Sequence, residues 1–314
     1  MNPVILDMDP GVDDALALIL ALKSPELEVL GVTTVSGNVP VDLGTRNALR
    51  VLHLICRNDV AVHTGAARPL LREPIRAEAV HGSDGLGDID LPDSGRRATS
   101  EDAVGFLVRT VLDRPRHVSL IATGPLTNLA LAIGRSPGIL REARQVIIMG
   151  GAVREEGNAT PTGEFNFVAD PHAAKEVIGC GADITLVPLD VTHRCVLSGS
   201  VLYERVEPRA TPVSDFVNQA TLLGREHAQR LEGIDGFHLH DPLAVAMGID
   251  RSMCEAECMR LDVEADGALT AGQVVADRRR YLDDARRVGS NVKVCVGVSQ
   301  RRFRAFFLER ILNR

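Results

Sequence analysis

The sequence predicts an α/β fold, in which a mostly parallel β-sheet carries helices on both faces. Short, continuously apolar runs recur along the chain, and most precede a segment whose apolar residues repeat with the 3.6-residue period of a helix. Strands buried on both sides are apolar throughout rather than alternating, so these runs predict a sheet covered on each face. At 314 residues and 45% hydrophobic, the chain is large enough for a substantial core.

The predicted elements follow one another in a regular order. The expected buried strands are residues 4–6, 27–35, 118–122, 145–149 and 184–189. The expected helices are residues 15–22, 42–56, 100–112, 126–134 and 171–179. Because strand and helix alternate without an internal repeat or a linker, we expect a single α/β domain over residues 1–314.

Two further segments complete the predicted architecture. Residues 197–235 are polar with helical patterns, which predicts a helical insertion able to cover a pocket. A strand at 292–298 and an amphipathic helix at 301–312 predict a small C-terminal β/α extension. Ligands in such sheets bind at the carboxyl ends of the strands, so functional residues are expected in the loops that follow strands.

The charge balance argues against a nucleic-acid-binding protein. The chain carries 35 Lys and Arg against 42 Asp and Glu, a formal net charge of -7, whereas phosphate backbones require a basic face. One basic run, residues 278–280, is followed by Asp283 and Asp284, and we interpret it as a solvated face. The expected partner is therefore a small molecule rather than a nucleic acid.

The sequence predicts neither membrane association nor secretion. No apolar stretch reaches the roughly 18 residues of a membrane span, and the first residues lead into a strand-like run without a basic region or cleavage site. The six cysteines are widely spaced with no C-x-x-C pair, so reduced, buried thiols are expected. Together these features predict a cytoplasmic protein.

The most informative segment is LDMDPGVDDALA, residues 6–17, which places four aspartates within eight positions. Asp7 and Asp9 lie at the end of the first predicted strand, and Asp13 and Asp14 lie at the start of the next helix. Helix capping explains one carboxylate there. It does not explain four, because each like charge raises the cost of ionising the others. A bound cation would convert this repulsion into attraction.

Calcium is the expected cation. It takes about 6 to 8 oxygen ligands, and Asp9 and Asp14 are placed to converge on one such ion. Magnesium usually needs a phosphate partner, and the chain has no G-x-x-x-x-G-K loop. Asp7-Met8-Asp9 also imitates the D-x-D motif of a phosphohydrolase, although Gly11 stands where that motif has Thr or Val. A D-x-D phosphohydrolase is therefore an alternative function.

Polar residues also follow other predicted strands. Asn38 comes after the second strand, and the turn in ATGPLTN after the third is expected to expose the carbonyl of Thr123. The loop after the fourth strand, GNATPTGEFNFVADP, brings three polar side chains close together: Asn158, Glu164 and Asn166. Taken singly, an Asn beside Gly is more often a simple turn residue.

The segment HLHDPLAVA places His240 and Asp241 immediately before a predicted helix. Asp241 before a proline is also a good helix cap, and His238 is expected to be an exposed loop histidine. Acidic, amide and imidazole groups nevertheless occur together on five strand-end loops. This combination is what a polyol-binding metal site requires.

Motifs along almost the whole chain resemble the nucleoside hydrolase family of the inosine-uridine preferring type. The matching segments are DMDPGVDDA (7–15), GNV (37–39), VHGSDGLG (80–87), ATGPLTN (122–128), IIMGGA (147–152), GNATP with EFN and DP (157–171), and HDPLAVA (240–246). The first motif alone is moderately specific, and the set is highly specific.

The resemblance implies a Rossmann-related fold, one Ca²⁺ per subunit and hydrolysis of the N-glycosidic bond of ribonucleosides. It implies carboxylate ligands to the metal at Asp9, Asp14 and Asp241, a backbone carbonyl ligand at Thr123, and a homodimer or homotetramer. Asp9 would also be the general base, and His240 would protonate the departing base. The implied substrate-binding residues are Asp13, Asn38, His81, Asn158, Glu164, Asn166 and His240.

The chain also departs from the family pattern. Met8 stands where relatives usually carry Thr or Cys and is expected to point into the core. Residues 225–237 contain no tyrosine near the base, which leaves His227, Gln229 and Arg230 as polar candidates. The absence of tryptophan excludes the subgroup that holds purines between indole rings. Purine or pyrimidine preference stays open, as does a nucleoside-binding protein without catalytic activity.

Overall fold

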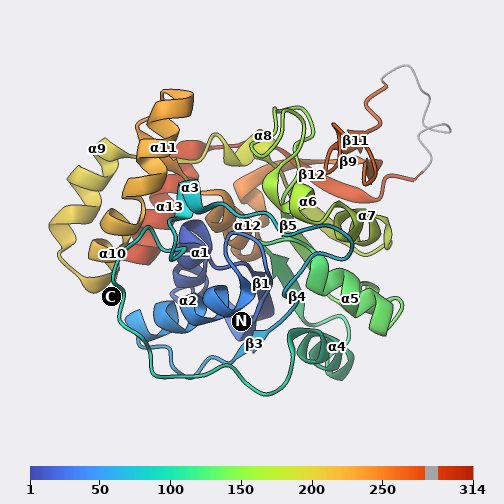
Figure 1. The fold of residues 1–314 in the computed structure, drawn as a ribbon, viewed down its shortest axis with the longest axis horizontal. Helices are drawn as coiled ribbons and strands as arrows, with labels where there is room; N and C mark the ends of the chain where they lie inside the picture. The colour runs from blue at the N-terminus through green and yellow to red at the C-terminus, as the bar shows by residue number, and fades with distance from the viewer. Residues whose placement is uncertain (280–288, 314) are drawn as a thin grey trace.

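An eight-stranded β-sheet forms the centre of the computed structural model, which describes residues 1–279 and 289–313 (Figure 1). Its strands are β1 (Asn2–Met8), β2 (Leu27–Thr34), β3 (Val62–Thr64), β4 (Ser119–Ala122), β5 (Gln145–Met149), β6 (Ile184–Val187), β9 (Cys254–Met259) and β12 (Val292–Val298). Their order is β3-β2-β1-β4-β5-β6-β12-β9, and every neighbouring pair is parallel except β12 and β9. The mostly parallel sheet confirms the predicted fold class.

The centre of the sheet positions the site. Strand β1 pairs with β2 on one side and with β4 on the other, so the chain winds outward in opposite directions from this point. A reversal of strand order leaves a crevice beyond the carboxyl ends of the two strands. The loops after β1, β2, β4 and β5 therefore lead to the same end of the sheet.

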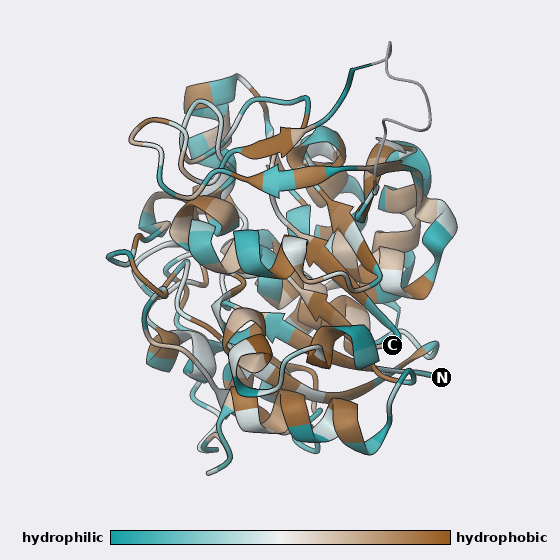
Figure 2. Cartoon of the chain, turned by 90° about the vertical axis from the view of Figure 1, so that its right-hand side faces the viewer, coloured by the Kyte–Doolittle hydropathy of each residue, from teal (hydrophilic) through white to brown (hydrophobic). Residues whose placement is uncertain are grey.

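Helices cover both faces of this sheet (Figure 1). One face carries α1 (Val12–Leu22), α2 (Val41–Leu54), α12 (His240–Ile249) and α13 (Gln300–Leu312), and the other carries α4 (Ala103–Asp113), α5 (Thr127–Arg135) and α7 (Pro171–Gly179). Strand β1 contributes Val4, Leu6 and Met8 to the first core and Ile5 to the second. Both sides of the strand are therefore apolar, and Figure 2 shows hydrophobic colour along the central strands.

The segment expected to be a helical insertion begins and ends in a small antiparallel sheet of β7 (Val196–Ser198) and β8 (Gly236–His238). Between these strands lie α9 (Gly199–Val201), a π-helical turn (Leu202–Val206), a 3-10 turn (Glu207–Arg209), α10 (Pro212–Ala220) and α11 (Leu222–Glu232). Helix α11 packs against α3 (Glu78–His81), which follows the β3 strand. The insertion thus reaches the side of the crevice.

The remaining elements are short. They are α6 (Phe165–Ala169), α8 (Leu189–Thr192), 3-10 turns at Ile139–Glu142 and Arg251–Met253, and the antiparallel pair β10 (Leu261–Val263) and β11 (Val274–Ala276). None of the helices in the described ranges is long and apolar enough to cross a membrane. The basic run at 278–280 ends outside the described residues, as do Asp283 and Asp284.

Several predicted boundaries shift, and each shift has a local cause. Helix α1 begins at Val12 rather than at residue 15, because Asp13 and Asp14 occupy its first turn. Helix α4 begins three residues later than predicted, because the Asp102 side chain accepts a hydrogen bond from Gly105 N at 2.8 Å. Strand β6 ends at Val187, because the chain turns directly into α8.

Two strands of the eight-stranded sheet escaped the sequence analysis, and the thiols differ in burial. Strand β3 has only three residues, and the four central residues of the edge strand β9 are exposed, so neither shows a buried apolar run.

All six cysteines are free thiols, as predicted. Cys56 and Cys258 are exposed, so the expectation of buried thiols is wrong at those two positions.

Replacing Phe307 by alanine is expected to lower the free energy of unfolding by about 3 to 5 kcal/mol. Phe307 is 0% exposed in the core that α13 shares with α1 and α12, and its ring lies 6.2 Å from that of Phe303. Denaturant unfolding monitored by circular dichroism measures the change. Phe306→Ala is the matched control, because Phe306 is only partly buried and should cost clearly less. Equal losses in the two variants would contradict this account of α13 packing.

Candidate active site

A cavity of about 860 Å³ opens where the strand-end loops meet. Most residues singled out from the sequence line it: Asp13, Asn38, His81, Thr123, Asn158, Glu164, Asn166, His240 and Asp241. Asp9 and Asp14 are 0% exposed and lie behind this lining. The structure therefore brings together side chains that are up to 232 positions apart in the chain, between Asp9 and Asp241.

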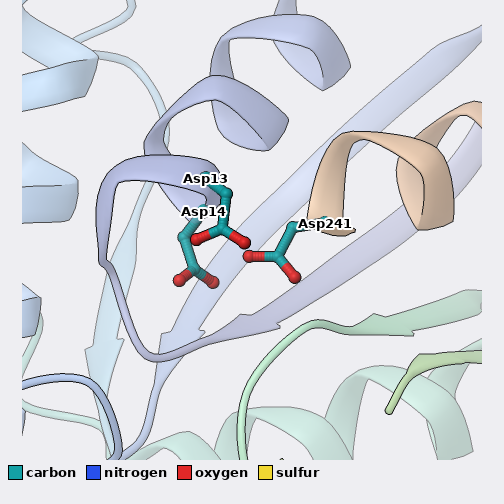
Figure 3. A group of neighbouring side chains, drawn as sticks. All are labelled: Asp13, Asp14 and Asp241. Carbon is teal, nitrogen blue, oxygen red and sulfur yellow. The ribbon is translucent and has the colours of Figure 1, made fainter. Parts of the chain in front are cut away.

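Three carboxylates form the acidic centre of the site (Figure 3). One oxygen atom from each of Asp13, Asp14 and Asp241 lies within 4.8 Å of the others. Asp13 and Asp14 come from the first turn of α1, and Asp241 comes from the first turn of α12, which packs against α1. Burial raises the pKa of Asp13 to about 7 and that of Asp14 to about 6. Burial, then the charge of Asp13, raises the pKa of Asp241 well above its usual value.

Asp9 lies beside this centre, and the backbone of neighbouring loops packs closely around its carboxylate. Its Oδ2 accepts a hydrogen bond from Asn38 N at 2.7 Å, and its Oδ1 has no partner among the described residues. Glycines at 37 and 124 allow this placement, since a Cβ on Gly124 would lie 2.7 Å from Asp9 Oδ1 and one on Gly37 would overlap Oδ2. Burial, then the charge of Asp14, raises the pKa of Asp9 well above its usual value.

The donor set fits a hard metal cation. Asp9 Oδ1, Asp13 Oδ1 and Asp241 Oδ2 are buried oxygens without a hydrogen-bond partner in the described part of the chain. Burying an unpaired carboxylate is costly, and a cation bound by several oxygens removes that cost. The Thr123 carbonyl already accepts a bond from Asn166 Nδ2 at 2.7 Å, but a carbonyl oxygen has a second lone pair for a metal. The cluster could therefore hold a metal ion.

Asp7, the first of the four clustered aspartates, has a structural role instead. Its Oδ1 accepts hydrogen bonds from Thr33 Oγ1 at 2.5 Å and Asn128 Nδ2 at 2.8 Å. These contacts join β1 to β2 and to α5. Burial raises the pKa of Asp7 to about 7. The opening motif thus combines one aspartate that ties elements together with three that belong to the site.

Amide and carboxylate groups line the cavity beside the acidic centre. Asn38 Nδ2 donates to Asp14 Oδ2 at 3.2 Å. Glu164 caps α6, where its two oxygens accept bonds from the backbone N–H groups of Asn166 and Phe167, and from Gly151 N at 2.8 Å. Burial raises the pKa of Glu164 to about 7. These fixed groups present oxygen atoms to a ligand without needing to reorient.

Asn158 differs from the other predicted residues. It is exposed, although it lines the cavity, and its Oδ1 accepts a bond from Phe165 N at 2.9 Å. This bond fixes the loop that precedes α6. Asn158 therefore makes an ordinary turn contact and also lines the cavity.

Imidazoles also line the cavity. His81 Nδ1 accepts a bond from Val12 N at 3.1 Å, and burial lowers the pKa of His81 to about 4, so its ring is neutral at pH 7. The ring of His240 lies 5.3 Å from that of His238 and 5.7 Å from that of His193. Burial, then the neighbouring His238, lowers the pKa of His240 well below its usual value.

Two of these histidines were missed or misplaced by the sequence analysis. His238, expected to be exposed, has a side chain only 10% exposed; it contacts Glu232 Oε2 at 2.9 Å and lines the cavity. The fold places it there because β8 leads directly to α12. His193 also lines the cavity and directly follows α8, the short helix that comes after β6, so the strand-end rule points to this region of the chain.

Only one of the three polar residues of the insertion that were considered for base contacts lines the cavity. His227 of α11 lines the cavity, whereas Gln229 and Arg230 do not. Arg230 instead lies with Nη2 at 3.2 Å from His227 Nδ1. Apolar side chains make up much of the remaining wall, and they include Val80, Met149, Phe165, Leu231 and Phe237.

Comparison with known proteins settles the family. A family profile described as "Inosine-uridine preferring nucleoside hydrolase" matches residues 4–305 of the chain. The chain belongs to this nucleoside hydrolase family. This membership confirms the resemblance predicted from the motifs, and with it an N-glycosyl hydrolase.

Individual nucleoside hydrolases resemble the chain over nearly its whole length. A "Pyrimidine-specific ribonucleoside hydrolase RihA" from Salmonella arizonae is 38% identical over 276 residues, which is 88% of each chain. The solved "Purine-Preferring Ribonucleoside Hydrolase from Gardnerella vaginalis" is 33% identical with a TM-score of 0.92, covering 99% of this chain and 98% of that one. An uncharacterised protein of Schizosaccharomyces pombe is 40% identical over 275 residues, 87% of this chain and 88% of its own.

Replacing Gly37 by alanine is expected to reduce nucleoside hydrolysis by about 100-fold, because a misplacement of about 1 Å in a catalytic group has that effect. The added methyl would overlap the Asp9 carboxylate and lie 2.8 Å from Pro125 Cδ. Release of free base is the readout, and the thermal midpoint reports folding.

Gly134→Ala on α5 is the control, because no atom lies within 4 Å of the Cβ that it adds. The control should keep wild-type activity. If Gly37→Ala did the same, Asp9 would not require the position that the backbone imposes on it.

Proposed function

We propose that the protein hydrolyses the N-glycosidic bond of ribonucleosides to ribose and free base, with Ca²⁺ bound at the acidic centre. One observation carries this proposal: in a nucleoside hydrolase, buried carboxylates with unpaired oxygens border a cavity that is also lined by amide and imidazole groups. We further propose that the whole chain forms one such domain. The family match favours this function over the D-x-D phosphohydrolase alternative.

The proposed metal ligands are the carboxylates of Asp9, Asp14 and Asp241 and the backbone carbonyl of Thr123. An all-oxygen set with several carboxylates suits Ca²⁺, which tolerates irregular geometry better than Mg²⁺. When bound, the cation supplies Lewis-acid polarisation of a water molecule and of sugar hydroxyls. Asp13 shares the cluster and lines the cavity, and we assign it to a ribose hydroxyl.

Asp9 is proposed as the general base. Its Oδ1 has no hydrogen-bond partner among the described residues, so it is free to accept a proton from the attacking water. Cleavage of the bond from the anomeric carbon to a base nitrogen builds positive charge on the ribose ring. Oxygens of Asn38, Glu164 and Asn166, held by the fold, stabilise that charge, and Asn158 is proposed to contact a further hydroxyl.

The departing base is proposed to leave toward the imidazoles. A base that leaves as an anion is a poor leaving group, so a nearby donor to its nitrogen or oxygen atoms lowers the barrier. His240 and His81 both line the cavity. The relatives named above include a pyrimidine-specific and a purine-preferring hydrolase, so a panel of inosine, adenosine, uridine and cytidine is the direct test of base preference.

Removing divalent cations is expected to abolish hydrolysis across this panel and to lower the thermal midpoint. Without a cation, the buried carboxylates repel one another; at 100 times its Kd, a bound ion contributes about 2.7 kcal/mol of stability. Ca²⁺ should restore both properties, and Mg²⁺ should restore less. Elemental analysis of the purified protein gives the metal content. Full activity in a protein free of divalent metal would contradict the proposal.

Asp9→Asn is expected to retain ribose binding and to lose about 10² to 10⁴-fold in kcat, because the base is gone while other ligands keep the metal. Steady-state kinetics and ribose titration measure the two properties. Asp113→Asn makes the same chemical change on an exposed carboxylate of α4 and should have no effect. Undiminished turnover in Asp9→Asn would remove Asp9 from the base role.

A further inference from the structure

We propose that Thr192 is a positioning residue that holds His240 in one neutral tautomer, with the ring proton on Nε2. The imidazole then presents an N–H donor toward the cavity, where the departing base would lie. This inference rests on the proposed function for its catalytic consequence. The tautomer itself is a property of the folded chain and can be tested separately.

The contact between the two residues is short and buried. Thr192 is the last residue of α8 and is 0% exposed, and its Oγ1 lies 2.8 Å from His240 Nδ1. Within the described residues, the hydroxyl of Thr192 makes no other hydrogen bond. Its backbone N–H is already used, since it donates to Pro188 O at 3.2 Å.

The hydrogen-bond requirement of the hydroxyl decides which atom donates. A threonine hydroxyl carries one proton, and leaving that proton without an acceptor in a buried place costs free energy. His240 Nδ1 is the acceptor within reach, so Thr192 donates to it. A ring nitrogen that accepts carries no proton. The proton of the neutral imidazole is therefore on Nε2.

The opposite nitrogen of His240 faces open space. His240 lines the cavity and is only half-buried. In the described part of the chain, its Nε2 forms no hydrogen bond and is not among the buried polar atoms that lack a partner. Solvent therefore reaches this atom, and a ligand in the cavity can do so too.

Two other histidines show that the same physical rule fixes tautomers elsewhere in the chain. His81 Nδ1 accepts from the backbone N–H of Val12, so its proton is also on Nε2. His63 shows the contrast: its Nδ1 lies 2.8 Å from Thr99 Oγ1 and 2.9 Å from Glu101 O. A carbonyl can only accept, so the proton of His63 is on Nδ1, and the Thr99 hydroxyl has Glu101 O as its own acceptor.

The tautomer has a direct consequence for the reaction. A neutral His240 with its proton on Nε2 can donate to a nitrogen or oxygen atom of the departing base. With the proton on Nδ1, the ring would present a lone pair to that atom and repel it. Thr192 would therefore affect the chemical step without touching the substrate.

The spectroscopic test uses the full-length protein labelled with ¹⁵N-histidine, near pH 8, where neutral imidazoles predominate. The two ring-nitrogen shifts of a neutral imidazole differ strongly between its tautomers, and a His240→Gln spectrum assigns the His240 signals. We expect wild type and Thr192→Ser to show the proton on Nε2, and Thr192→Val to show a mixture. A wild-type proton on Nδ1, or an unchanged tautomer in Thr192→Val, would overturn the inference.

The kinetic test compares ribonucleosides with an activated nitrophenyl riboside, whose leaving group needs no proton. Thr192→Val should lower kcat on nucleosides by about 10-fold or more with little change in KM, and should leave the nitrophenyl riboside nearly unaffected. Thr192→Ser should restore nucleoside turnover, because it restores the hydroxyl. Equal losses on both substrates would assign Thr192 a purely structural role.

A second Thr-to-Val change controls for loss of a histidine contact in general. Thr99→Val removes the hydroxyl beside His63, outside the cavity lining, and should leave both substrates unaffected. The two proposals also fail in different ways. If wild type cleaved no ribonucleoside, the proposed function would fall, while the nitrogen shifts would still decide the role of Thr192.

Discussion

Concentrated negative charge in a buried place is the constraint on which the rest of this structure depends. Asp9, Asp13, Asp14 and Asp241 lie together with little solvent, and burial raises the pKa of each. A protein can satisfy such a group by protonation or by a cation. Three unpaired oxygens, which no protein donor reaches within the described residues, favour the cation. The proposed roles of the metal, the sugar hydroxyls and the attacking water all depend on that choice.

The scaffold holds these charges on rigid elements rather than on loose loops. Asp13, Asp14 and Asp241 lie in the first turns of two helices that pack against each other in the core, where the positive end of a helix dipole favours negative charge. Glycines at 37 and 124 let the backbone close around Asp9. Asp7 joins β1 to its neighbours through hydrogen bonds. The site is therefore preorganised by packing as well as by its own contacts.

Neutral imidazoles are the second feature of the cavity lining. Burial disfavours the charged form of His81 and His240, so each ring is a hydrogen-bond donor on one nitrogen and an acceptor on the other. The partner of Nδ1 then decides which nitrogen donates into the cavity. In the proposed reaction, charge acts on the sugar, whereas hydrogen-bond direction acts on the departing base. This division matches a reaction that builds positive charge on the sugar and negative charge on the base.

The sequence by itself determined the fold class, the main strands and the loops that carry the site. Those features depend on local periodicity and on short motifs, and both can be recognised from residues that are close together in the sequence. It also identified the acidic motif, but not which aspartate was structural. Only the tertiary structure decided that Asp7 bonds to Thr33 and Asn128, that His238 and His193 reach the cavity, and that Thr192 meets His240. The physical reason is that a hydrogen-bond partner or a desolvating neighbour usually comes from a distant segment, and its position is fixed only when the sheet and helices pack.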